Sequence, residues 1–263
     1  MNLQIEGDTA IVTASSSGLG KASAKSLARE GANVIINGRT KSDLEEAAEE
    51  IRDVATGSVV IQQGDITNEE DIEQLVETAV SQFGGLDHLV TNAGGPPSGP
   101  FLETTDEDWY HAYELLVMSV VRLAREAAPH LQQSDQGTIV TITSRSVKEA
   151  IDSLVLSNSV RMSVIGLEKT LSKELAPDVR ANAVLPGPHE TSRTEELITD
   201  AVERGEYNSY EEGLESRASG IPLKRLGDPN ELGDIVAFLS SPASGFINGT
   251  AIPVDGGATG SNL

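Results

Sequence analysis

Seven short runs of apolar residues recur along the chain, separated by longer segments of mixed polarity. A short apolar run with little alternation is typical of a strand that is buried on both faces of a parallel sheet. We therefore predict strands at 9–13, 33–37, 59–62, 88–92, 138–143, 180–185 and 251–254.

Most segments between these strands carry apolar residues three or four positions apart, with acidic residues on the opposite face. Leu44, Ala47 and Ile51 form one such set, and this spacing predicts helices that cover a sheet. Two long helices are predicted at 106–132 and 153–176. Because strands alternate with helices, we predict an α/β fold: a doubly wound parallel sheet of about seven strands with helices on both faces, a three-layer sandwich.

The length of 263 residues fits one large α/β domain, 1–263, and no low-complexity linker divides it. The absence of cysteine excludes disulfides, thiolate metal sites and cysteine nucleophiles, and no metal site is predicted. No secretory signal is visible, and no window is apolar over the roughly twenty residues that a membrane span needs. We therefore expect a soluble cytoplasmic protein with no membrane partner.

The chain is strongly acidic, with 41 acidic and 19 basic residues and a net charge of −22. The acidic residues are spread along the chain, so their mutual repulsion is a burden in dilute buffer that molar salt screens. This favours a halophilic host, and the alternative is an ordinary acidic enzyme. A nucleic-acid partner is disfavoured because phosphate neutralisation needs a basic face.

The first predicted strand leads into the stretch 13–20, which reads Thr-Ala-Ser-Ser-Ser-Gly-Leu-Gly. Its glycines allow a tight turn, and a helix that begins near Gly18 points unpaired N–H groups at a ligand above the turn. We predict a phosphate-binding loop, and an ordinary strand–helix connection is the alternative. The candidate binding residues are Thr13, Ser15, Ser16, Ser17, Gly18, Leu19 and Gly20.

Further candidates follow the next strands. Arg39, after the second strand, stands where an acidic residue would bind a ribose 2′-hydroxyl, and its guanidinium suits a 2′-phosphate. This favours NADP(H) over NAD(H), unless Arg39 is only a surface charge. Asp65, next to Ile66, is predicted to accept a hydrogen bond from adenine, or else to cap the helix that starts near Asn68.

Four motifs together resemble the short-chain dehydrogenase/reductase family over essentially the whole chain. The loop 13–20 resembles its T-G-x-x-x-G-x-G, and the rigid turn Asn92-Ala93-Gly94 belongs to a segment that resembles its N-N-A-G. Residues 182–187 resemble N-x-V-x-P-G, and 247–257 resemble I-x-G-x-x-x-x-V-D-G-G. The resemblance implies a Rossmann-type fold, a nicotinamide cofactor and a dimer or tetramer.

The same resemblance locates the departures from the family pattern. Ala14 replaces the first glycine of the loop, which is tolerable if its φ is negative. Ser144 matches the family's catalytic serine, whereas Ser157 and Arg161 stand where its Y-x-x-x-K motif has tyrosine and lysine. Leu116 stands at the family's asparagine.

These residues imply a modified active site on a polar carbonyl or alcohol substrate, of 3-oxoacyl or sugar and polyol type. Ser144 would bind the substrate oxygen, Ser157 would relay a proton, and Arg161 would bind the nicotinamide ribose. The other interpretation is a catalytically silent nucleotide-binding regulator or partner subunit.

Further residues are assigned around this site. Pro186 and Gly187 are assigned to the cofactor, and Thr191 matches a family threonine that contacts the nicotinamide amide. His189 is either a proton donor or a loop histidine.

Two further expectations come from outlying segments. The acidic segment 190–220 is predicted to form two short helices that act as a lid over the substrate, or else a rigid surface excursion. The two long helices carry more apolar surface than one sheet face requires, so we expect a homo-oligomer, a tetramer or a dimer.

Overall fold

All seven predicted strands form one parallel sheet in the computed structural model of the protein, which describes residues 2–262 apart from the side chains of residues 193, 196, 197 and 200. The order across the sheet is β3-β2-β1-β4-β5-β6-β7. The strand bounds are β1 (Thr9–Val12), β2 (Asn33–Gly38), β3 (Val59–Gln63), β4 (His88–Thr91), β5 (Thr138–Ile142), β6 (Arg180–Pro186) and β7 (Ala251–Val254). The predicted doubly wound, Rossmann-type α/β fold is therefore confirmed.

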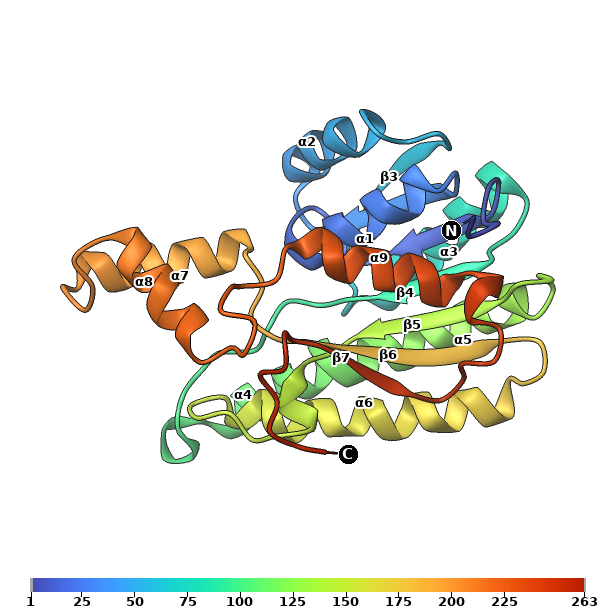
Figure 1. The fold of residues 1–263 in the computed structure, drawn as a ribbon. Helices are drawn as coiled ribbons and strands as arrows, with labels where there is room; N and C mark the ends of the chain where they lie inside the picture. Colours follow the sequence, from blue (N-terminus) through green and yellow to red (C-terminus); the bar gives the residue numbers. More distant parts are fainter. Residues whose placement is uncertain (1, 263) are drawn as a thin grey trace.

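Helices cover both faces of the sheet (Figure 1). The first face carries α1 (Gly18–Arg29), α2 (Lys41–Arg52) and α9 (Pro229–Ser240), and all three contribute buried residues to one apolar cluster with the sheet. The second face carries α3 (Glu69–Phe83), α5 (Ser119–Leu131) and α6 (Val155–Glu174). The three-layer arrangement matches the prediction from the apolar spacing.

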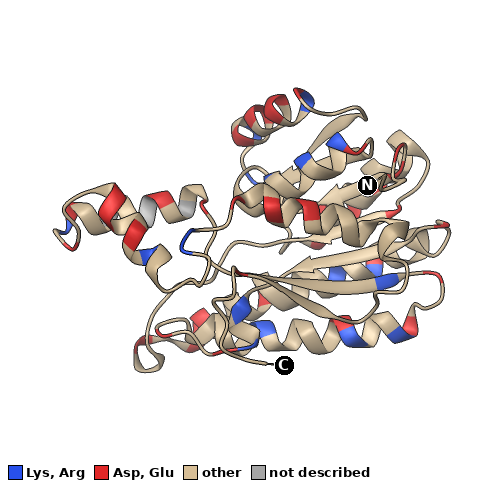
Figure 2. Cartoon of the chain, in the orientation of Figure 1, with Lys and Arg blue, Asp and Glu red and all other residues tan. Residues whose placement is uncertain are grey.

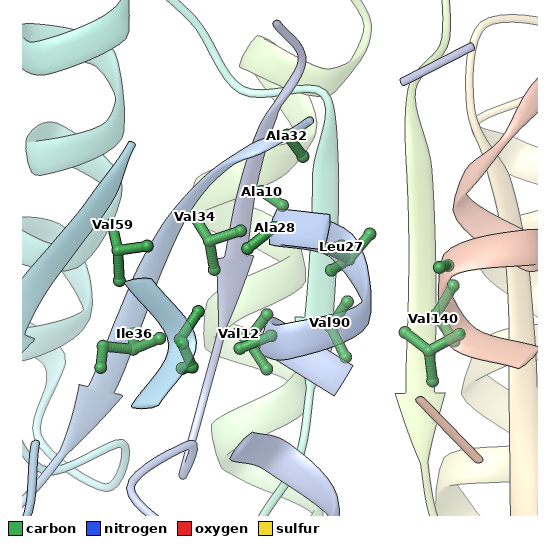
Figure 3. Close-up of a cluster of buried hydrophobic side chains, with 14 of the residues drawn as sticks. Ala10, Val12, Leu27, Ala28, Ala32, Val34, Ile36, Val59, Val90 and Val140 are labelled. Carbon is green, nitrogen blue, oxygen red and sulfur yellow. The ribbon is translucent and has the colours of Figure 1, made fainter. Parts of the chain in front are cut away.

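The first cluster shows why the short apolar runs become strands. Val12, Val34 and Val90 lie on three neighbouring strands and belong to the same apolar cluster as Leu27 of α1, and these four side chains are fully buried (Figure 3). Burial of side chains of this size contributes about 1.5–3 kcal/mol each. The sheet core therefore holds the first strand and first helix in a fixed relation, and the loop between them is held with it.

The predicted helix over 106–132 is wrong as one element. The segment divides into α4 (Asp106–Tyr113), a π-helical turn (Glu114–Met118) and α5. A π-turn inserts one residue into the helical repeat and displaces the side chains that follow it. Leu116 lies buried within this turn.

Two short helices, α7 (Ser192–Glu203) and α8 (Tyr210–Ser219), fill the segment 190–220 as predicted. They project beyond the end of the sheet to which the strands point (Figure 1). Acidic residues lie on many helices, with several on α2 and α8 (Figure 2). Within residues 2–262, no helix is long and apolar enough to span a membrane.

Candidate active site

A cleft of about 510 Å³ opens beyond the carboxyl ends of the strands, where the strand order reverses between β1 and β4. Parallel sheets bind ligands at such a reversal. We call it the Ser16 cleft, after the loop residue that lines it. Eleven of the residues that the sequence predicted to bind the cofactor line this cleft: Ser16, Ser17, Gly18, Leu19, Arg39, Asp65, Ile66, Asn92, Ala93, Gly94 and Thr191.

The loop leaves the amino end of α1 open toward this cleft. Ser17 is the N-cap residue, but its hydroxyl does not cap the helix, and the first turn of α1 carries no acidic side chain. Gly18 follows with φ +54°, a conformation that favours glycine. The open N–H groups, the helix dipole and the neighbouring hydroxyls therefore fit a phosphate group, so the residues present suit a dinucleotide.

Three loop residues predicted to bind the cofactor do not line the cleft and instead shape the loop. The Thr13 hydroxyl donates to the carbonyl oxygen of Asn92 (2.7 Å) and accepts from its N–H (2.8 Å), which joins the ends of β1 and β4. The buried Ser15 hydroxyl donates to the Val12 carbonyl oxygen (2.6 Å). A Cβ on Gly20 would lie 2.3 Å from the Ala14 carbonyl oxygen, so only glycine lets α1 approach this closely.

Ala14 adopts φ +45°, so the condition under which its methyl group would be tolerated without strain, a negative φ, is not met. A left-handed conformation costs an alanine roughly 1–2 kcal/mol because its Cβ approaches the following carbonyl oxygen. The Asn92 side-chain amide donates to the Ala14 carbonyl oxygen (3.1 Å), and Ala14 lines the cleft. The surrounding hydrogen bonds therefore hold the turn in the shape that glycine would adopt freely.

Arg39 and Asp65 lie on the rim of the cleft. The cap of α3 is Asn68, whose side chain accepts from the N–H groups of Glu70 and Asp71, so the alternative capping role for Asp65 is wrong. Partial burial opposes ionisation of Asp65, but hydrogen bonds from Thr67 and the charge of Arg39 hold its pKa below the usual value. Asp65 is therefore an ionised acceptor that faces the cleft.

A second pocket, of about 240 Å³, adjoins the first and shares Leu19 and Thr191 with it. We call it the Ser144 pocket. It brings together the three predicted catalytic residues and most of the residues predicted after β6. Those that line it are Ser144, Ser157, Arg161, Pro186, Gly187, His189 and Thr191.

Three serines form a connected group at this pocket. Ser144 directly follows β5, and its hydroxyl oxygen accepts from the N–H of Ser146 (3.1 Å), which leaves its own hydrogen available to a ligand. The hydroxyls of Ser146 and Ser157 are 3.1 Å apart and buried. The sequence did not single out Ser146, although its position two residues after Ser144 is the spacing of a side-chain turn.

Asn158 is a second residue that the sequence reasoning missed. Its side-chain amide donates to the carbonyl oxygen of Ile151 (2.9 Å), and its amide oxygen accepts from the Ile151 N–H (3.2 Å). These two bonds fasten the loop after Ser144 to the first turn of α6. They therefore fix how Ser157 faces Ser144.

Arg161 lies one helical turn after Ser157 and is 8% exposed. Burial lowers the pKa of its guanidinium to about 10, so the group is charged at neutral pH. Its Nε has no hydrogen-bond partner among the residues that the structure describes. Arg161 also lines an inner cavity of about 10 Å³, the space of one water molecule, together with Leu116, Thr91 and Thr141.

Glu168 is the buried titratable residue that the sequence reasoning missed. It is 2% exposed, and the Thr141 hydroxyl donates to one of its carboxyl oxygens while Thr91 donates to Thr141 (2.8 Å). Burial raises the pKa of Glu168 to about 8, against which the bond from Thr141 acts weakly. The carboxyl group is therefore mainly protonated at neutral pH.

The His189 ring is buried, and its Nδ1 donates to the Gly187 carbonyl oxygen (2.9 Å). Burial lowers its pKa, although this hydrogen bond and two nearby carboxylates act in the opposite direction. Arg145 and Lys148, which follow Ser144 in the chain, do not line the Ser144 pocket. Arg161 is therefore the side-chain cation among the described residues that line this pocket.

Comparison with known proteins adds the family. The family described as Enoyl-(Acyl carrier protein) reductase matches residues 13–259. The short chain dehydrogenase mdpC of Emericella nidulans is 33% identical over 261 residues, which cover 97% of this chain and 96% of that protein. The 3-oxoacyl-(acyl-carrier-protein) reductase FabG of Thermotoga maritima is 31% identical over 256 residues, 97% of this chain and 99% of that protein.

Solved structures agree with this result. The L-sorbose reductase of Gluconobacter frateurii, complexed with NADPH and L-sorbose, superposes with a TM-score of 0.95 and 32% identity and covers 99% of this chain and 100% of its own. The chain belongs to the short-chain dehydrogenase/reductase family. It is an enzyme of that family, an NAD(P)-dependent oxidoreductase of carbonyl or alcohol substrates.

Proposed function

We propose that the protein is an NADP(H)-preferring oxidoreductase that transfers hydride to or from a polar carbonyl or alcohol. The observation that carries this proposal is the juxtaposition of the Ser16 cleft, open at the amino end of α1, with the Ser144 pocket and its serine group. The bound nicotinamide supplies or accepts the hydride. The protein supplies binding, orientation and a route for the proton.

The serine group and Arg161 then have separate roles in the reaction. The Ser144 hydroxyl, whose oxygen is already engaged by Ser146, donates its hydrogen to the substrate oxygen. The buried Ser146–Ser157 hydroxyl pair passes a proton from water to the oxygen that becomes negative during reduction. Arg161 binds the nicotinamide ribose and stabilises negative charge without giving up its own proton.

This arrangement is a divergent form of the family's active site, with Ser157-x-x-x-Arg161 in place of Tyr-x-x-x-Lys. A serine hydroxyl is a much weaker acid than a phenol, so Ser157 serves as a relay and not as the proton source. We therefore propose that the pocket still supports hydride transfer, with Ser157 as the proton relay and Arg161 as the group that binds the ribose.

The substrate is proposed to be of the sugar or polyol type, with a 3-oxoacyl type as the alternative. The crystallised L-sorbose reductase and the 3-oxoacyl reductase FabG support these two classes, respectively. We propose that α7 and α8 act as the lid. Their position beyond the carboxyl ends of the strands supports this role (Figure 1).

A reduction screen at molar KCl tests the proposal. Sugars, 2-oxo acids and 3-oxoacyl thioesters are supplied with NADPH or NADH, and the loss of absorbance of the reduced nicotinamide is followed. We expect turnover of at least one polar carbonyl with NADPH. Binding of NADPH without turnover of any carbonyl, or of any alcohol with NADP⁺, would instead favour the silent regulator or partner subunit.

Replacing Arg39 with alanine is expected to weaken NADPH binding by about tenfold to a hundredfold, because a 2′-phosphate loses a charge-assisted partner. The affinity for NADH is expected to stay the same. Fluorescence titration with NADPH and with NADH measures the two dissociation constants. Arg52→Ala, at the end of the helix α2 that follows Arg39, is the matched control. Equal losses for NADPH and NADH would show that Arg39 does not read the phosphate.

We propose a halophilic setting in the cytoplasm, supported by the net charge of −22. Raising KCl from 0.1 M to 2 M is expected to increase the melting temperature by several degrees, since salt screens the repulsion between carboxylates. Differential scanning calorimetry measures this shift. A melting temperature that stays constant or falls over this range would contradict it.

We also propose that the protein is a homo-oligomer, most favourably a tetramer, with a dimer as the alternative. Tyr110 and Tyr113 of α4 and Met162 of α6 are large side chains that are 47–76% exposed in the isolated chain. Pairing of these helices with their copies would remove that surface from water. Light scattering in 2 M KCl is expected to give two or four times the mass of 27.7 kDa, and a single-chain mass would refute the assembly.

A further inference from the structure

Among the described residues that line the Ser144 pocket, one carries a formal charge at neutral pH, and that charge is positive. Of the residues that line it, only Arg161 is a strong acid or base, and His189 is held toward its neutral form by burial. This lone cation belongs to a chain in which acidic residues outnumber basic ones by 41 to 19. The net charge of the described residues that line the pocket is therefore positive, whereas the net charge of the whole chain is negative.

No carboxylate of the described chain compensates Arg161. Among the described side chains, burial alone sets the direction of its pKa shift, with no contribution from an acidic neighbour, and its Nε lacks a hydrogen-bond partner. Glu168 lies two helical turns further along α6 and is buried too. Its carboxyl group instead receives the Thr141 hydroxyl, and its raised pKa keeps it mainly neutral.

A buried guanidinium without acceptors or counter-charge is costly, and such a group indicates a ligand that supplies both. Ribose hydroxyls supply acceptors but no negative charge. The guanidinium has five N–H donors in a planar fork, which is enough to bind a ribose and to pair with a carboxylate. The second partner must therefore come from the substrate.

We propose that the Ser144 pocket binds a substrate carboxylate against Arg161, so that the enzyme reduces 2-oxo acids and oxidises 2-hydroxy acids. The carboxylate is placed next to the reacting carbon because Arg161 lies one turn from Ser157 and lines the same pocket as Ser144. This inference rests on the proposed function and replaces its sugar or polyol type with a 2-oxo acid, a polar carbonyl compound that also carries a carboxylate. Of the described lid residues, Thr191 and Thr194 line the pocket, and both are uncharged.

The reaction balances without a further reagent. In reduction, the keto carbon gains a hydride from the reduced nicotinamide and the keto oxygen gains one proton that enters from water through Ser157. The carbonyl π bond is the bond that breaks, and the carboxylate is unchanged. The oxidised nicotinamide and the 2-hydroxy acid leave.

The test compares each 2-oxo acid with its methyl ester, beginning with pyruvate and methyl pyruvate, at saturating NADPH. The ester has the more electrophilic keto group, so chemistry alone favours it. We expect kcat/KM to be at least about tenfold higher for the acid, the value of one good charge-assisted pair. Equal rates, or a preference for the ester, would overturn the proposal.

Variants of Arg161 separate this contact from a ribose contact. Arg161→Gln is expected to abolish the preference for the acid, and Arg161→Lys to restore part of it, because the lysine keeps the charge. The ratio of the two rates is the readout, since loss of a ribose contact lowers both rates alike. An acid preference that persists in Arg161→Gln would show that the carboxylate binds elsewhere.

A binding measurement covers the case in which neither compound turns over. Calorimetric titration of the NADPH-loaded protein and the free protein with oxamate, an unreactive carboxylate, is expected to show binding that methyl oxamate lacks and that Arg161→Gln weakens at least about tenfold. No binding of oxamate would overturn the carboxylate site. Failure of the proposed function would be recognised differently, by the absence of NADPH binding or of any turnover, neutral carbonyls included.

Discussion

We expect the wild-type protein to lose much of its stability between pH 5 and pH 8, and we expect Glu168→Gln to prevent most of that loss. The folded protein raises the pKa of this carboxyl from 4.5 to about 8 because it is buried. Over that interval the unfolded chain releases the proton while the folded chain retains it, so the free energy of unfolding falls as pH rises. The loss is roughly 3–5 kcal/mol and is complete above the folded pKa.

Glutamine has the shape of the protonated acid but cannot ionise, and it still accepts the Thr141 hydroxyl. Urea denaturation at fixed KCl, repeated from pH 5 to pH 9, measures the free energy of unfolding of both proteins. Glu174→Gln, at the exposed end of the same helix, is the matched control and is expected to keep the wild-type slope. If Glu168→Gln keeps that slope as well, the carboxyl group is ionised in the folded protein.

Replacing Ser144 with alanine is expected to lower kcat/KM for the carbonyl substrate by about a hundredfold to a thousandfold. The hydroxyl is the donor aimed at the reacting oxygen, and loss of one such donor has an effect of this size. The affinity for NADPH is expected to change less than twofold, since Ser144 does not line the Ser16 cleft. Steady-state kinetics and a fluorescence titration measure the two quantities.

Ser42→Ala, an exposed serine on α2, serves as the control for Ser144→Ala and is expected to leave both quantities unchanged. A loss of NADPH affinity in Ser144→Ala that matches the loss of kcat/KM would assign Ser144 to cofactor binding. Retention of full activity would remove it from the catalytic site.

The strands and the loop at 13–20 were predictable because their signals are local. Val34 and Ile36 belong to a short apolar run, which is typical of a strand buried on both faces. Gly18 is glycine at a turn position with positive φ, a conformation that favours this residue type. The conformation of Ala14 was not predictable in this way. Its positive φ is enforced from a distance by the bond from Asn92, which follows a different strand.

Two features on the second face of the sheet, the π-turn and the burial of Glu168, were also missed because they depend on contacts with other segments. The π-turn around Leu116 depends on packing against α6, which an apolar pattern along one segment does not record. Glu168 was treated as one of many acidic helix residues. Its position four residues after Val164 and eight after Val160 places it on the buried face, and this spacing is the signal that could have identified it.

The proposed function depends most on whether the Ser16 cleft binds a nicotinamide dinucleotide. Titration of the protein in 2 M KCl with NADPH, followed by the fluorescence of the reduced nicotinamide, measures this directly. We predict saturable binding of one NADPH per chain, with weaker binding of NADH. If neither the reduced nor the oxidised forms of the two cofactors bind, the assignment of the cleft and the proposed function are both contradicted.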